Sequence, residues 1–151
     1  MKHKSIRIEL VVIEAFIGLA AISGGMAILA GAFDQWFSAA WLAGTPFSDY
    51  TIPGLILLIV VGGGMLFAAA TQFIQRAWAV LLSASMGLVM IGWVIVEGAI
   101  IDRYEQAVVP STVGQQILIA VLGLLVFGLS VYLWMTEYRG HSFLTRHTSH
   151  A

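Results

Sequence analysis

Four long apolar stretches run along the chain, separated by short polar or aromatic segments. Each stretch has about twenty residues, enough for an α-helix to cross roughly 30 Å of hydrocarbon. The pattern therefore predicts a single all-α transmembrane domain over residues 1–151, a polytopic membrane four-helix bundle. The predicted spans are residues 10–33, 53–74, 78–101 and 116–136.

The connecting segments predict how these spans follow one another. Residues 34–52 are rich in aromatic side chains, which favour the headgroup layer, so we expect an interfacial outer loop there. The short turn Gln75-Arg76-Ala77 forces the second and third spans into an antiparallel arrangement, and the bundle then consists of two transmembrane hairpins. A loop through Pro110 and Gly114 is expected before the last span, and residues 137–151 are predicted to form a polar tail.

Lysine and arginine are distributed unequally between the two sides of this arrangement. Cytoplasmic segments of membrane proteins carry an excess of these residues. Under the four-span prediction Arg103 lies on one side, and the remaining six cations lie on the other: Lys2, Lys4, Arg7, Arg76, Arg139 and Arg146. The bias predicts a multi-pass membrane protein with both termini in the cytoplasm.

The composition agrees with this class and excludes several chemistries. Hydrophobic residues make up 60% of the chain and charged residues 10%, against roughly 25% charged in an average soluble domain. A net charge of −1 gives no reason to expect nucleic acid as a partner. The chain has no cysteine, its histidines lie outside the spans, and phosphate-loop, nucleophile-elbow and zinc-helix motifs are absent. No catalytic residue, cofactor or metal site is predicted.

Each predicted span has a row of small and polar residues at alternating spacings of three and four. Such rows face the interior of a membrane helix bundle, where small residues let backbones approach. The rows are Glu14, Gly18, Ala21, Gly25 and Ile28; Leu57, Val61, Gly64, Ala68 and Thr71; Ser83, Met86, Met90, Trp93 and Glu97; and Gln116, Ala120, Gly123, Phe127 and Ser130.

Two acidic residues within the spans, Glu14 and Glu97, are candidate functional groups because ionisable side chains are costly inside a membrane. Glu14 is placed near the cytoplasmic boundary, at the level of a candidate cluster of Thr71, Gln72 and Arg76. That cluster is either a polar cytoplasmic vestibule or a structural arrangement in which Arg76 or Lys4 neutralises Glu14.

Glu97 is placed at the opposite, outer end. A candidate outer cluster surrounds it, composed of Asp49, Tyr50, Trp93, Asp102 and Arg103. One interpretation is an ion pair between Glu97 and Arg103 that ties the third span to a loop. The other is an outward-facing acidic pocket in which Glu97 binds a cation or exchanges a proton.

Two short motifs carry a resemblance to a known class of proteins. Ser48-Asp49-Tyr50-Thr51-Ile52-Pro53-Gly54 leads into the second span, and Gly92-Trp93-Val94-Ile95-Val96-Glu97 lies in the third. The chain resembles, over all four spans, small four-span bacterial membrane proteins of unknown function. The resemblance implies the four-span architecture and a location in the bacterial plasma (inner) membrane, and it directs attention to Asp49, Tyr50 and Glu97, without implying an activity.

The sequence leaves three classes of function open. The first is small-solute or ion transport linked to protons, through a bundle that would need to form a homo-oligomer to enclose a path. The second is a non-catalytic membrane subunit or scaffold that binds another membrane protein. The third is a membrane enzyme acting on lipid or quinone, for which Glu97 with Asp49 and Asp102 would be the active site.

Overall fold

The computed structural model describes residues 2–32, 42, 47–101 and 110–137, and this part of the chain is almost entirely helical. Helix α1 spans Lys2–Leu29. A second rod is continuous from Thr51 to Ile74 and consists of α2 (Thr51–Leu55), the π-helix η2 (Ile56–Gly63), α3 (Gly64–Thr71) and the 3-10 turn η3 (Gln72–Ile74). Helices α4 (Ala77–Ile101) and α5 (Pro110–Glu137) follow. Within the described residues four helices are long and apolar enough to cross a membrane, which confirms the all-α prediction.

The helix boundaries differ from the predicted ones at α1 and α5. Helix α1 already begins at Lys2, and it ends at Leu29 because Gly31 adopts a left-handed conformation with φ 71°. The amides of Gly31 and Ala32 then bond back to the carbonyls of Ile28 and Ala27, which is a glycine C-cap. Helix α5 begins at Pro110, where a loop was predicted, because proline is well suited to the first turn of a helix.

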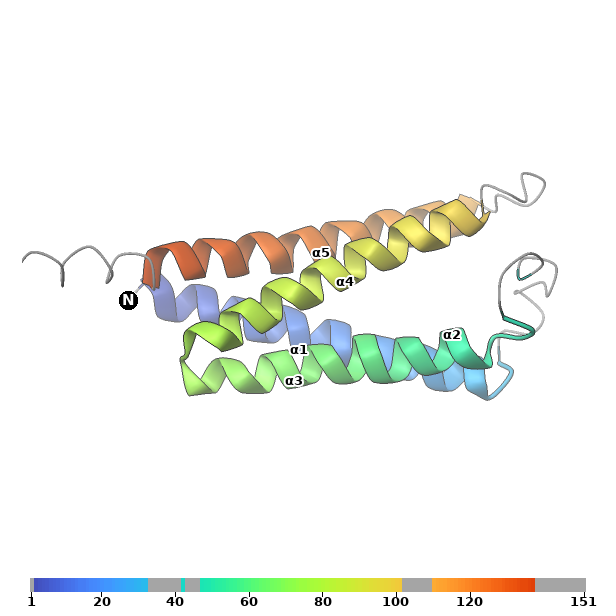
Figure 1. Ribbon diagram of the computed structural model, residues 1–151, viewed down its shortest axis with the longest axis horizontal. Coiled ribbons are helices and arrows are strands. Elements are labelled where there is room, and N and C mark those ends of the chain that lie inside the picture. The colour runs from blue at the N-terminus through green and yellow to red at the C-terminus, as the bar shows by residue number, and fades with distance from the viewer. Residues whose placement is uncertain (1, 33–41, 43–46, 102–109, 138–151) are drawn as a thin grey trace, which may run out of the picture.

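The predicted tight turn between the second and third spans is confirmed. The rod ends in η3, Gln75 adopts a left-handed conformation with φ 56°, and α4 begins at Ala77. The chain therefore reverses direction over very few residues, and α3 packs against α4. We call the end of the molecule that contains this turn, the start of α1 and the end of α5 the Arg7 end (Figure 1).

The four long helices pack as two close pairs. Helix α1 lies along η2 and α3, while α4 lies along α5, and the pairs meet through α1 with α5 and through α3 with α4. Figure 1 shows the pairs together at the Arg7 end and diverging toward the opposite end, where α2 begins.

Glycines lie where the backbones of paired helices touch. A Cβ on Gly18 would lie 3.1 Å from the Gly62 carbonyl oxygen, and a Cβ on Gly87 would lie 2.8 Å from the Gly123 carbonyl oxygen. These crossings are the close approaches that small residues permit.

The predicted interior rows lie inside the bundle. Most of their members are buried and the rest are half-buried, whereas large apolar side chains on the opposite faces, such as Phe16, Ile59 and Leu124, are exposed. Buried apolar residues on these faces, including Ala21, Val61 and Met86 of the predicted rows, belong to one core that continues through all four helices. The alternating three and four spacing therefore identified the inward faces correctly.

Candidate functional site

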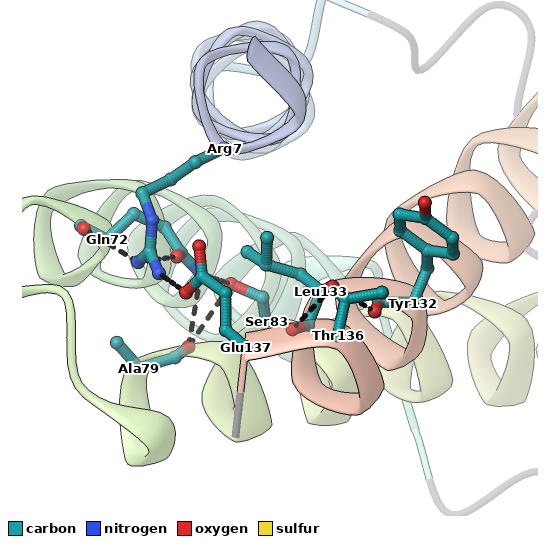
Figure 2. Close-up of polar contacts among 8 residues, drawn as sticks. All are labelled: Arg7, Gln72, Ala79, Ser83, Tyr132, Leu133, Thr136 and Glu137. Atoms are coloured by element: carbon teal, nitrogen blue, oxygen red, sulfur yellow. Dashed lines mark hydrogen bonds and ion pairs between the residues drawn. The ribbon is translucent and has the colours of Figure 1, made fainter. Parts of the chain in front are cut away.

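A buried arginine connects three of the four helical rods at the Arg7 end. Arg7 of α1 is only 8% exposed, and its guanidinium donates to the backbone oxygen and to Oε1 of Gln72, both at 3.0 Å. The same group forms an ion pair of 2.5 Å with Oε2 of Glu137, the last residue of α5. Figure 2 shows the Arg7 side chain reaching from α1 between these two partners. The charge of Arg7 is thereby compensated inside the protein.

Gln72 extends this network to the remaining helix. Its amide nitrogen donates to the Ser83 hydroxyl at 2.6 Å and to the Ala79 carbonyl at 3.2 Å, both on α4 (Figure 2). Gln72 is fully buried, yet both ends of its amide have partners, as a buried polar group requires. Arg7, Gln72, Ser83 and Glu137 therefore form one polar cluster, the Arg7 cluster, to which α1, η3, α4 and α5 each contribute.

Glu14 lies two helical turns beyond Arg7 on the same face of α1. Its side chain is 0% exposed, and neither carboxyl oxygen has a hydrogen-bond partner among the described residues. Ser83 is a polar neighbour of this carboxyl, and its hydroxyl also lies 3.3 Å from the Ala79 carbonyl oxygen. A hydroxyl can donate or accept a hydrogen bond, so Ser83 is the polar group through which the Arg7 cluster approaches Glu14.

Helices α1 and α5 place side chains of three kinds at successive levels. The two helices are antiparallel, and the Arg7–Glu137 ion pair fixes their register. Steps of three and then four residues along α1, and of four and then three along α5, lead from that pair first to a fully buried apolar level and then to the level of Glu14. The levels are Arg7 with Glu137, Leu10 with Leu133, and Glu14 with Ser130.

Beyond Glu14 the interior is apolar. Among the described residues, every buried polar or charged side chain lies at the level of Glu14 or nearer the Arg7 end. The next levels toward the other end are filled by Ile17, Ala21, Val61, Met65, Met86 and Met90. Glu14 therefore lies where a polar region meets an apolar one.

The predicted cluster at the other end is not assembled by the described residues. Glu97 is half-buried, and its Oε2 is buried without a hydrogen-bond partner in the described part of the chain. The Trp93 indole lies beside it. Asp49 and Tyr50 precede α2, whose start is well separated from the end of α4 in Figure 1. Asp102 and Arg103 lie outside the described residues, so the Glu97–Arg103 ion pair stays a prediction.

Asp49 has a structural contact of its own. Its Oδ1 accepts a hydrogen bond of 2.9 Å from the Thr51 amide at the start of α2, and this bond, with a second from the Thr51 side chain, holds the pKa of Asp49 below its usual range. Burial raises the pKa of the neighbouring Tyr50 phenol.

We predict that NMR titration will give Asp49 a pKa below the ordinary value of about 3.9. Because the folded-state pKa is depressed, the contribution of this carboxylate to stability is present above the ordinary pKa and is lost as pH falls through the folded one. Asp49→Asn should remove that pH dependence while retaining an oxygen acceptor for the Thr51 amide. An ordinary pKa for Asp49 would mean that the contact does not persist in solution.

The predicted cluster around Glu14 is present in part. Gln72 belongs to the Arg7 cluster, and Thr71 is buried but donates to the Ala68 carbonyl at 2.8 Å on its own helix. The expected neutralisation of Glu14 by Arg76 or Lys4 is wrong for the described residues, because both cations are exposed and Glu14 has no partner there.

Sequence reasoning missed the pairing of Arg7 with Glu137, because Arg7 was counted only among the cytoplasmic cations and Glu137 was placed in the polar tail. The sequence does contain a pattern that places Arg7 on the inward face of its helix. The interior row of Glu14, Gly18 and Ala21 continues toward the start of the chain, by four residues to Leu10 and by three more to Arg7. The row of α5 likewise extends forward from Ser130 to Leu133 and Glu137.

Within the described residues no group of three or more histidine, aspartate or glutamate side chains could hold a metal ion. The chemistry that the site offers is that of one buried carboxyl next to a hydrogen-bonded polar cluster. Comparison of the chain with protein-family models, curated protein sequences and solved structures finds no match.

Proposed function

We propose that this protein is a proton-linked transporter of a small solute or ion in the bacterial plasma membrane, and that Glu14 carries the proton. The observation that supports the proposal most directly is the complete burial of Glu14 with neither oxygen hydrogen-bonded among the described residues. An ionised carboxylate in such a place costs several kcal/mol. A carboxyl that is neutral when enclosed and ionised when hydrated can take up a proton on one side and release it elsewhere.

A proton suits this site better than a hard metal cation does. Calcium takes 6–8 oxygen ligands and magnesium an octahedral set. Around Glu14 the polar side chains at its level are the hydroxyls of Ser83 and Ser130, and Ser130 donates to the Val126 carbonyl at 2.6 Å on its own helix. A single carboxyl with so few oxygen neighbours can bind a proton without further ligands.

The apolar levels beyond Glu14 are consistent with transport by alternating access rather than through an open channel. A carrier must be closed on one side while its site faces the other, and Ile17, Met65 and Met86 provide such a closure. Glu97, near the other end, is the acid that a proton would next reach. The distribution of lysine and arginine supports cytoplasmic termini, so in this proposal the Arg7 end faces the cytoplasm. We further propose that the functional unit is a homo-oligomer.

The proposal is tested with Glu14→Gln, which preserves the size of the side chain and removes its ability to ionise. Purified protein is reconstituted in liposomes containing a pH-sensitive dye, and proton movement is driven by a potassium diffusion potential. We expect the parent to move protons. The variant should lose at least about 90% of that rate, because the substitution removes the side chain that carries the proton. Glu9→Gln is the matched control, since Glu9 is an exposed acid on the same helix, and it should keep the parent rate.

Infrared difference spectroscopy gives a second measurement that needs no substrate. A protonated carboxylic acid band should change with pH in the parent and in Glu9→Gln, and this band should be missing from Glu14→Gln. Equal proton flux in the parent and in Glu14→Gln would refute the role of Glu14. Absence of flux in the parent itself would favour the alternative of a non-catalytic membrane subunit.

A further inference from the structure

We infer that the Arg7–Glu137 ion pair is a gate that controls access to Glu14 from the Arg7 end. This inference rests on the proposed function and concerns the regulation of the same site. The ion pair is the contact that must open before water reaches the carboxyl, and the last turn of α5 is the part of the chain that moves.

The position of the Arg7–Glu137 ion pair relative to solvent and to Glu14 supports this gate. Counting seven residues along α1 from Arg7 to Glu14 gives a separation of about 10 Å along the helix axis. The Glu137 side chain is 23% exposed to solvent, whereas Glu14 is fully buried. The ion pair therefore lies between the solvent-accessible edge of the bundle and the buried carboxyl.

A series of polar contacts leads inward from the ion pair to Glu14. Arg7 bonds to Gln72, Gln72 bonds to Ser83, and Ser83 is a neighbour of Glu14. Beside this polar route, the level of Leu10 and Leu133 is fully buried and apolar. Among the described residues at this end, either the Arg7 cluster must separate or the Leu10–Leu133 level must open before water reaches Glu14.

The last turn of α5 is the part of the gate that can move. Glu137 is the last residue of α5, and helix ends open at low free-energy cost compared with helix interiors. Gln72, by contrast, is held by bonds to Arg7 and to α4. Breaking the ion pair therefore releases the last turn of α5, which carries Leu133 away from Leu10, while the Gln72 contacts remain. Buried ion pairs add little net stability, so the energy needed to open this one is modest.

The chain contains no cysteine, so a single introduced thiol reports access without background. Ser130→Cys places a thiol at the level of Glu14, and a membrane-impermeant thiosulfonate reagent is applied to both faces of vesicles. The reagent reacts with the thiolate, which forms where water has access. We expect a very slow reaction with the closed gate and at least a tenfold faster one, as an order-of-magnitude estimate, when Glu137→Gln is added.

Three further variants keep this test decisive. Glu137→Asp retains the charge on a shorter side chain and should give an intermediate rate even if Glu137→Gln folds poorly. Glu9→Gln, added to Ser130→Cys, should leave the rate unchanged. Thr136→Cys, an exposed position on α5, should react rapidly in every background and thereby shows that the reagent is active.

Equal Ser130→Cys rates in the parent, Glu137→Asp and Glu137→Gln backgrounds would overturn the gate. This outcome leaves the proposed function intact if Glu14→Gln still abolishes proton flux. Conversely, faster labelling in the Glu137 variants together with no flux in the parent supports the gate as an access control and refutes transport. The two ideas therefore fail on different measurements.

Discussion

Gly87→Ala is expected to destabilise the protein, although alanine is the better helix former. A Cβ on Gly87 would lie 2.8 Å from both the Gly123 carbonyl oxygen and the Phe127 amide nitrogen. Both are backbone atoms of α5, so no flexible side chain can give way, and the two helices must separate. Overpacking of this kind costs about 1–3 kcal/mol, which exceeds the roughly 1 kcal/mol gained in helix propensity.

Gly92→Ala is the matched control for this prediction. Gly92 lies on the same helix, and a Cβ there has no described neighbour within 4 Å. Only the higher helix propensity of alanine then affects the free energy of unfolding, so Gly92→Ala should leave the stability unchanged or raise it slightly. Thermal denaturation in detergent, followed by size-exclusion chromatography, should show a loss of stability for Gly87→Ala and no loss for Gly92→Ala. A gain of stability in both variants, or a similar loss in both, would mean that α4 and α5 do not cross at Gly87 and Gly123.

The helices of this protein could be predicted well from the sequence, and their ends less well. Apolar stretches of about twenty residues have few alternatives to helix in a membrane, and the turn at Gln75 follows from its short length. The end of α1 depends on one left-handed glycine, Gly31, which an apolar window does not distinguish from glycines inside helices. Residues Ile56–Gly63 adopt the π-helix η2, in which Gly62 packs on α1, and an apolar pattern does not distinguish this conformation from an α-helix.

The candidate site was predictable only where its residues lie inside the apolar stretches. Glu14 stood out because a carboxyl is unusual there, and helix register placed Thr71 and Gln72 near its level. Arg7 and Glu137 are 130 positions apart, and each lies in a segment that looks like ordinary polar flanking sequence. Their pairing depends on how the first and last helices align, so sequence reasoning proposed other cations, Arg76 or Lys4, as the partners of Glu14.

Arg7→Met is expected to cause the largest loss of stability among the polar substitutions. The variant leaves the Glu137 carboxylate and the Gln72 carbonyl without the guanidinium that they share. Removing one partner of a buried ion pair costs about 3–5 kcal/mol, and we expect the low end because Glu137 is partly exposed. Unfolding in detergent, measured with urea or heat, should show this loss.

The double variant Arg7→Met, Glu137→Leu should recover most of that stability, since replacing both members of a buried pair with apolar residues is often neutral or favourable. It also separates stability from gating. Glu137→Gln weakens the contact and should expose Ser130→Cys, whereas the apolar pair restores a closed contact and should keep that thiol unreactive. If the double variant is as stable as the parent but labels as fast as Glu137→Gln, apolar packing does not close this end, and the charge interaction itself is what excludes water from Glu14.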